Sequence, residues 1–156
     1  GRIPAHILIP LGNGTLVIGV VKALEELLES GEIEKMPQII VVQSEHCDPF
    51  VKAVLAKAKT AAMDTAPRPT MAEGIAIGVP MRGEEILEYI YKYAIKVITA
   101  PEDRILEARM ALAATGIYCE HTTAASYAAY WKYCEVYGKT SDCLIPMCGA
   151  GLKSDH

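Results

Sequence analysis

Short apolar runs alternate with segments of helical spacing along this chain, and this alternation restricts the possible folds more than any other feature. The first run, His6 to Leu11, ends at Gly12, and apolar residues then recur every three or four positions up to Ser30 and Gly31. Such a change of period predicts a strand that leads into an amphipathic helix. The run 38–43 is apolar through its middle, as in a parallel strand that is covered on both faces.

The same alternation continues to the end of the chain. The patterns predict helices over Phe50–Ala58, Gly83–Tyr93, from Pro101 to Gly116, and from an N-cap at Thr122 or Thr123 to Tyr137; strands over Gly74–Val79, Lys96–Thr99, Ile117–Glu120 and Cys143–Met147; and an irregular loop over Thr60–Pro69. Strands that alternate with helices favour right-handed crossovers and a mainly parallel sheet. We therefore expect an α/β fold with three α/β/α layers, formed by one domain over residues 1–156.

Composition limits the classes of partner. Hydrophobic residues make up 51% of the 156 residues, enough for one core, and the net charge of -4 offers no basic surface to nucleic acid. The apolar runs are too short to cross a bilayer and no signal segment opens the chain, so we expect a cytoplasmic protein. The five cysteines include no C-x-x-C pair. The sequence therefore predicts neither a disulfide framework nor a metal site.

The first candidate site is the turn formed by Gly12, Asn13, Gly14 and Thr15, between the first strand and the first helix. Ligands of parallel sheets gather at the carboxyl ends of strands, and glycines allow the backbone N–H groups at a helix N-terminus to approach an anion. The turn lacks the third glycine of G-x-G-x-x-G and the G-K-[ST] of a P-loop. A small phosphorylated group is the favoured ligand, and a plain tight turn is the alternative.

Two more strand ends carry reactive side chains. Glu120 and His121 directly precede a helix rich in small residues, and Cys148 follows the last strand in a glycine-rich segment. Taken singly, Glu120 could be a solvated loop carboxylate, His121 an exposed turn residue, and Cys148 a small buried residue. Because the carboxyl ends of parallel strands share one edge, the three sites together indicate a ligand site.

The order of several motifs is similar to that of a known family. The motifs are I-P-L-G-N-G-T at Ile9–Thr15, P-Q-I-I-V-V-Q at Pro37–Gln43, T-M-A-E-G-I-A-I at Thr70–Ile77, G-I-Y-C-E-H-T-T-A-A at Gly116–Ala125, and C-G-A-G-L-K at Cys148–Lys153. Over essentially its whole length the chain resembles threonine synthase-like members of the fold-type II (tryptophan synthase beta-like) pyridoxal-phosphate enzymes. The resemblance is to their C-terminal domain.

The resemblance implies roles for particular residues. Gly12, Asn13, Gly14 and Thr15 would cradle the phosphate of pyridoxal 5'-phosphate, Cys148 would contact its pyridine nitrogen, and Glu120 would lie beside its ring. It also implies a homodimer that acts on an amino-acid substrate, by γ-elimination and β-replacement on O-phosphohomoserine. Serine/threonine ammonia-lyase activity, or a non-catalytic module that binds phosphate or the cofactor, remain as alternatives.

The sequence departs from this family at three places. The family binds its cofactor through a lysine upstream of the phosphate turn, and none of the eleven residues before Gly12 is a lysine. We therefore expect a fragment that lacks the lysine-bearing part, that is inactive alone and that pairs with the missing half or with a lysine-bearing subunit. Cys148 stands where threonine is usual, and His121 replaces a common proline.

Overall fold

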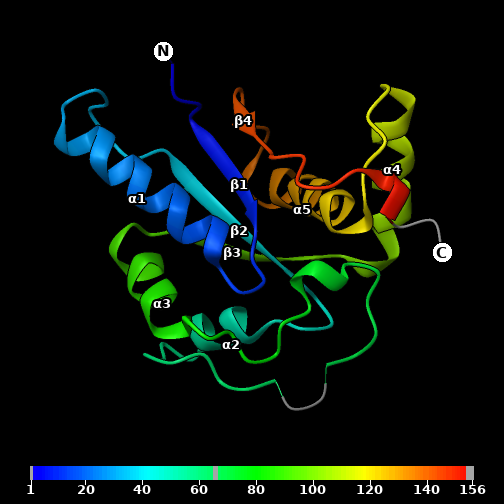
Figure 1. Cartoon of the computed structure of the whole chain (residues 1–156), viewed down its shortest axis with the longest axis horizontal. Helices are drawn as coiled ribbons and strands as arrows, with labels where there is room; N and C mark the ends of the chain where they lie inside the picture. The colour runs from blue at the N-terminus through cyan, green and yellow to red at the C-terminus, as the bar shows by residue number, and fades with distance from the viewer. Residues whose placement is uncertain (1, 65–66, 154–156) are drawn as a thin grey trace.

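Four parallel strands form the centre of the molecule. The computed structural model describes residues 2–64 and 67–153. Its strands are β1 (His6–Pro10), β2 (Gln38–Ser44), β3 (Lys96–Ala100) and β4 (Cys143–Leu144), and the sheet order is β3-β2-β1-β4, with every pair parallel (Figure 1). The predicted α/β class is confirmed.

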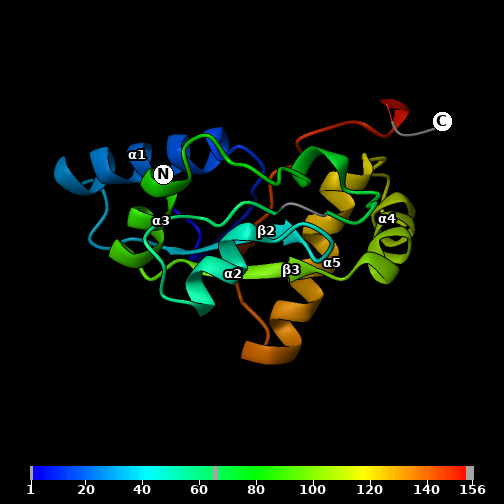
Figure 2. The same cartoon turned by 90° about the horizontal axis from the view of Figure 1, so that it is seen from below.

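Helices cover both faces of the sheet. On one face lie α1 (Thr15–Glu29), α2 (Pro49–Leu55) and α3 (Gly83–Lys92), and on the other lie α4 (Ile105–Ala114) and α5 (His121–Tyr137). Figure 2 shows α1 and α3 on the opposite side of the molecule from α4 and α5. Three short 3-10 helices complete the described elements: η1 (Glu73–Ile75), η2 (Glu102–Arg104) and η3 (Gly151–Lys153).

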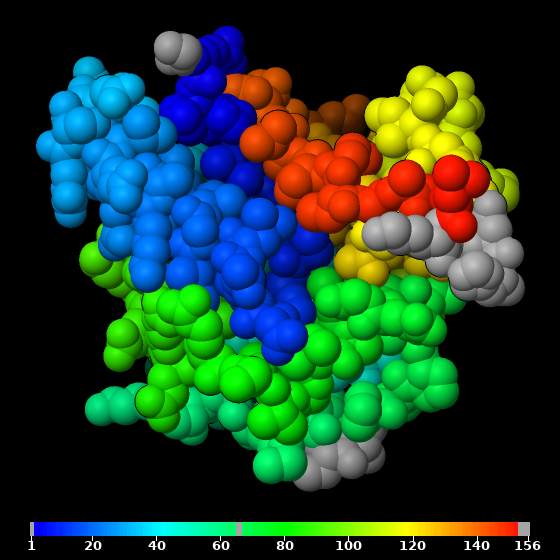
Figure 3. Space-filling view, viewed as in Figure 1, coloured from blue at the N-terminus to red at the C-terminus, as the bar shows by residue number. Residues whose placement is uncertain are grey.

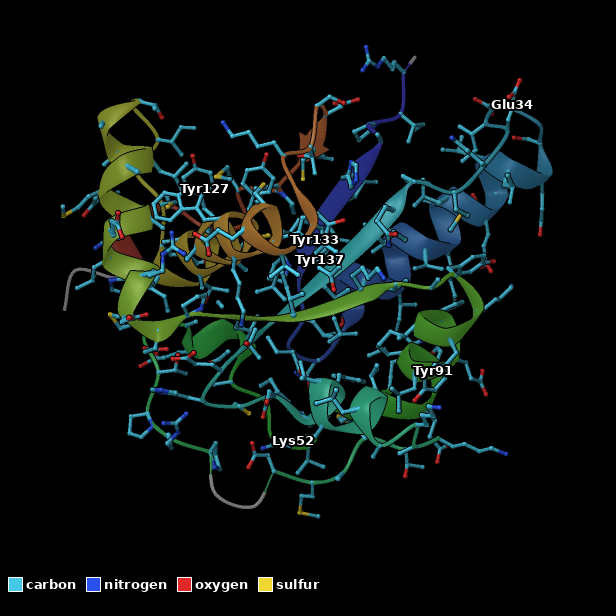
Figure 4. All side chains as sticks on the ribbon, turned by 180° about the vertical axis from the view of Figure 1, so that it is seen from behind. Glu34, Lys52, Tyr91, Tyr127, Tyr133 and Tyr137 are labelled. Atoms are coloured by element: carbon cyan, nitrogen blue, oxygen red, sulfur yellow. The ribbon has the colours of Figure 1, made fainter. Side chains whose placement is uncertain are left out.

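Each face of the sheet has its own apolar core, because successive strand residues point to opposite faces. Ile9 and Val41 pack with α1, α2 and α3, whereas Leu8 and Ile40 pack with α4 and α5. Tyr133 of α5 belongs to the second core (Figure 4). The central strands are therefore apolar without alternation, as a doubly covered parallel sheet requires. Within the described residues, no helix has both the length and the apolar character that a membrane crossing needs.

Two predicted strands are wrong. The segment Gly74–Val79 begins in the 3-10 helix η1 and forms no strand, and in Ile117–Glu120 only Cys119 makes an isolated antiparallel bridge, to Ala150. In the described part of the chain, neither segment pairs with β1, β2, β3 or β4. The Gly74 N–H donates to Oγ1 of Thr122, whereas Tyr118 and Glu120 exchange main-chain hydrogen bonds with Gly151 and Gly149.

Several predicted boundaries also change. Helix α5 begins at His121 with Glu120 as its N-cap, so the predicted caps Thr122 and Thr123 lie inside the first turn. The last strand is shorter than predicted and comprises Cys143–Leu144, and the helix expected from Pro101 is divided into η2 and α4. The loop predicted over 60–69 contains no helix or strand at 60–64 and 67–69, and residues 65 and 66 lie outside the described part.

Gln43 connects β2 to the start of α2. Its side chain is 1% exposed, and its Oε1 accepts hydrogen bonds from the N–H groups of Phe50 (2.9 Å) and Val51 (3.2 Å). Asp48, the N-cap residue of α2, makes no capping bond with its side chain. Gln43 therefore satisfies the N-terminal N–H groups of α2 from the neighbouring strand.

We expect Gln43→Leu to lower the free energy of unfolding by about 2 kcal/mol, because the N–H groups of Phe50 and Val51 lose their acceptor. Urea denaturation measures this change. Gln38→Leu is the matched control, since the half-buried Gln38 side chain donates to carbonyl groups near the strand end and its loss should cost less. Equal losses in the two variants would contradict the capping role of Gln43.

Candidate functional site

The turn after β1 needs its two glycines. Gly14 has φ +85°, in the left-handed region that favours glycine, and a Cβ atom there would lie 2.1 Å from Cδ1 of Ile86 on α3. A Cβ atom at Gly12 would lie 2.7 Å from the carbonyl oxygen of Gly74. The glycine-bearing turn is therefore held between α3 and η1, with no room for a side chain at either position.

The N-terminus of α1 is open to an anion. Gly14 is its N-cap residue and has no side chain that could cap the helix, and the first turn contains no acidic residue. Ile18 is the first residue whose N–H donates back to Gly14, at 2.9 Å, so the preceding N–H groups have no acceptor within the helix. Asn13 and Thr15 are both exposed beside them. Helix N-termini of this kind bind phosphate through backbone N–H groups and the helix dipole.

Glu120 and Cys148 lie side by side at the second part of the site. The N–H of Glu120 donates to the carbonyl oxygen of Gly149 at 3.0 Å, and a Cβ atom at Gly149 would lie 2.2 Å from Cδ of Glu120. The pairing continues through the Cys119–Ala150 bridge. The Glu120 carboxyl group is therefore pressed against the main chain next to Cys148.

The 3-10 helix η1 joins the two parts of the site. The Gly74 carbonyl oxygen lies against Gly12, and the Gly74 N–H donates to Oγ1 of Thr122 at 3.2 Å. Thr122 is two residues beyond Glu120, in the first turn of α5. In Figure 3 the blue turn after β1, the green segment around η1 and the orange-red segment before the C-terminus lie on one face of the molecule. The structure thus brings Gly12–Thr15, Glu120 and Cys148 to the same edge of the sheet.

A carboxylate that the sequence analysis did not identify anchors the segment before η1. Glu102, at the start of η2, accepts hydrogen bonds from the Thr70 hydroxyl (2.5 Å) and the Met71 N–H (2.6 Å). The Glu102 N–H donates in turn to Oε1 of Glu45, and the Ser44 hydroxyl donates to Oγ1 of Thr70, both at 3.0 Å. The T-M-A-E-G-I-A-I motif marked this segment in the sequence, but the motif does not indicate that Glu102 is its hydrogen-bond partner.

The thiol of Cys148 is shifted toward its protonated form. Partial desolvation raises its pKa, and the nearby Glu120 carboxylate raises it further. Its Sγ lies 3.6 Å from the carbonyl oxygen of Pro146, which accepts the thiol hydrogen. Cys148 therefore presents a neutral thiol near neutral pH.

We expect Glu120→Gln to move the pH midpoint of Cys148 alkylation downward. Removing the neighbouring negative charge favours the thiolate, so at a fixed pH near neutrality the variant should react faster. Iodoacetamide labelling followed by peptide mass analysis measures the rate at this cysteine, the one of the five that is exposed. Glu107→Gln, on the exposed face of α4, is the control and should leave the profile unchanged. An unchanged profile in Glu120→Gln would show that the two groups are not neighbours.

Comparisons with known proteins agree on one family. A family model described as pyridoxal-phosphate dependent enzyme matches residues 1–149. The threonine synthase of Methanocaldococcus jannaschii is 28% identical over 155 residues, and that of Methanosarcina acetivorans is 29% identical over 132 residues. The matches cover 97% and 84% of this chain but only 38% and 32% of the relatives, so the chain spans about a third of their length.

Solved structures share the fold at lower identity. The threonine deaminase of T.th. has a TM-score of 0.71 at 22% identity, covering 97% of this chain and 51% of that one. An L-serine ammonia-lyase from Rhizomucor miehei has a TM-score of 0.72 at 18% identity, covering 96% and 46%. A serine racemase from Dictyostelium discoideum gives 0.71 at 18%, covering 96% and 45%. These likenesses show the fold alone.

Proposed function

The chain belongs to the family of pyridoxal-phosphate dependent enzymes, and from that premise we propose that it is the cofactor-binding part of a threonine synthase-like enzyme. The reaction would be γ-elimination and β-replacement on O-phosphohomoserine. The name of the two curated relatives and the ordered motifs support this choice. The observation that carries the proposal is the contact of the glycine-bearing turn, through Gly74, with the segments that hold Glu120 and Cys148.

The residues present fit the cofactor. The N–H groups of Gly12–Thr15 would hold its phosphate, since the turn has no side chain at Gly12 or Gly14 and the start of α1 is uncapped. When bound, pyridoxal phosphate supplies an electron sink for charge that develops on the amino-acid substrate. Cys148 would keep a proton at Sγ, because its pKa is raised, and so offer a neutral donor to the pyridine nitrogen. Glu120 would lie beside the ring.

In this proposal the lysine that anchors the cofactor comes from outside the chain. Lys22, Lys52 and Lys92 form ion pairs with carboxylates of the helical layer, and Lys52 projects from α2 (Figure 4). Lys132 donates to Thr99 on β3. The side chain of Lys153 lies outside the described part of the structure. The same proposal has the chain bind the cofactor without catalysing the reaction alone, within a complete enzyme that is a cytoplasmic homodimer.

Loss of ammonia from serine or threonine is the second candidate. Cys148 favours it, because some dehydratases carry cysteine or serine where threonine synthases usually carry threonine. The glycine-alanine-glycine-leucine-lysine sequence that follows favours the synthase. An assay of the complete enzyme with O-phosphohomoserine and with threonine separates the two reactions, since only one of them should support turnover.

Titration of the chain with pyridoxal phosphate and with pyridoxine 5'-phosphate tests its proposed role. Pyridoxine phosphate has no aldehyde, so it measures the non-covalent site alone. We expect saturable binding of both by calorimetry, with no single lysine modified after borohydride treatment. A protein that binds neither ligand nor inorganic phosphate would overturn the proposal. A borohydride-trapped adduct at one lysine would overturn the proposal that the anchoring lysine comes from outside the chain.

A further inference from the structure

We propose that Arg109 of α4 is a positioning residue that locks the segment carrying Glu120 to the segment carrying Cys148. This inference rests on the proposed function, because it concerns the two side chains that would face the cofactor ring. Arg109 would act through the main chain and through the neighbours of Glu120. It would leave the phosphate-binding turn unaffected.

The guanidinium of Arg109 bridges the two segments. Its Nε donates to the carbonyl oxygen of Cys119 at 2.9 Å, and its Nη2 donates to the carbonyl oxygen of Gly151 at 3.2 Å. The first carbonyl belongs to the residue before Glu120, and the second lies two residues after Gly149. Between these positions the segments pair through main-chain contacts of Tyr118–Glu120 with Gly149–Gly151. The charged guanidinium donates to both segments and therefore strengthens their short main-chain pairing.

Tyr118 lies between Arg109 and the second segment. The Arg109 Cζ atom is 5.0 Å from the centroid of the Tyr118 ring, a distance at which a cation is attracted to the aromatic face. A Cβ atom at Gly151 would lie 2.6 Å from Cε1 of the same ring, so this glycine lets the second segment approach it closely. Because Tyr118 is 47% exposed, its position depends on these contacts more than on core packing.

Arg109 also contacts the residue after Glu120. Its Nη1 lies 3.4 Å from Nε2 of His121, the first residue of α5. A guanidinium can only donate, so this contact is a hydrogen bond when Nε2 carries no proton. His121 is half-buried, so it is not the exposed turn residue that the sequence allowed as an alternative. Arg109 thus fixes both neighbours of Glu120, the Cys119 carbonyl before it and the His121 ring after it.

The arrangement needs arginine. The planar guanidinium donates in three directions and stacks on Tyr118 at the same time, whereas a lysine ammonium is a point charge that cannot keep this geometry. Arg104 offers a matched control. It forms an ion pair with Glu135 at 2.8 Å and lies 5.1 Å over the ring of Trp131, and both of these contacts are away from the two segments of the site.

The test compares Arg109→Gln and Arg109→Lys with Arg104→Gln. Amide hydrogen exchange in the ligand-free chain reports the lock directly, at the Glu120 and Gly151 N–H groups that donate across the pairing. We expect Arg109→Gln to raise exchange at both amides about tenfold, and Arg109→Lys to have an intermediate effect. Exchange at the Leu11 N–H, which donates to Val42, should stay unchanged.

Ligand affinities separate positioning from general loss of structure. We expect Arg109→Gln to weaken the binding of pyridoxine 5'-phosphate about tenfold and the binding of inorganic phosphate less than about twofold. Arg104→Gln should change neither affinity. Unchanged exchange at Glu120 and Gly151, or equal weakening of the two ligands, would overturn the inference. A wild-type chain that binds phosphate but no pyridoxine phosphate would refute the proposed cofactor role, whereas the exchange measurement would still decide whether Arg109 holds the two segments.

Discussion

Gly14→Ala should lose cofactor binding and much of its stability. The new methyl group would lie 2.1 Å from Cδ1 of Ile86, and the residue would have to keep φ at +85°. The left-handed backbone costs about 1 kcal/mol and the overpacking about 1–3 kcal/mol, so we expect the free energy of unfolding to fall by about 2–4 kcal/mol. Displacement of the turn should weaken the binding of pyridoxine 5'-phosphate at least about tenfold. Urea denaturation and calorimetry measure the two effects.

Gly31→Ala separates the backbone cost from the steric clash. Gly31 has φ +74°, and an added Cβ atom would meet nothing within 4 Å. This variant should lose only about 1 kcal/mol of stability and bind the ligand normally. Adding Ile86→Val to Gly14→Ala removes the nearest clashing carbon and should restore part of the affinity. Normal binding by Gly14→Ala itself would refute the turn as the phosphate site.

Helices and strands could be predicted from the sequence wherever one regular spacing of apolar residues extends over the whole element. Strands β1 and β2 are apolar through their middles and helix α1 keeps a regular apolar face, so their layers could be predicted. The segments 74–79 and 117–120 have the composition of short strands as well. In the described structure neither segment joins the four-stranded sheet, and pairing over a long sequence separation cannot be read from a local pattern.

The candidate site divides in the same way. Glycines between a strand and a helix are a local signal, and the turn at Gly12 and Gly14 was therefore visible. Arg109 was not, because a single basic residue on a helix resembles a solvated surface residue. Its partners lie 10 to 42 positions away, at Cys119 and Gly151. Glu102 was missed for the same reason, since its acceptor role depends on Thr70, 32 positions earlier.

Gly149→Ala should reduce affinity for the cofactor ring with little effect on stability. The added Cβ atom would lie 2.2 Å from Cδ of Glu120 and less than 3 Å from both carboxylate oxygens. These atoms end a flexible side chain, and Gly149 has no positive φ, so the clash can be relieved by moving the carboxylate. We expect the free energy of unfolding to change by less than about 1 kcal/mol. Calorimetry should show that the affinity for pyridoxine 5'-phosphate falls about tenfold.

Two comparisons decide whether that loss comes from Glu120. Inorganic phosphate, which needs only the turn after β1, should bind Gly149→Ala as it binds the wild type. Gly19→Ala, where an added Cβ atom on α1 meets nothing within 4 Å, should gain about 0.5–1 kcal/mol of stability and keep both affinities. If Gly149→Ala binds pyridoxine phosphate normally, the carboxylate has no part in holding the ring. If it weakens both ligands equally, Gly149 supports the whole edge of the sheet, and the separate assignment of phosphate and ring to different segments fails.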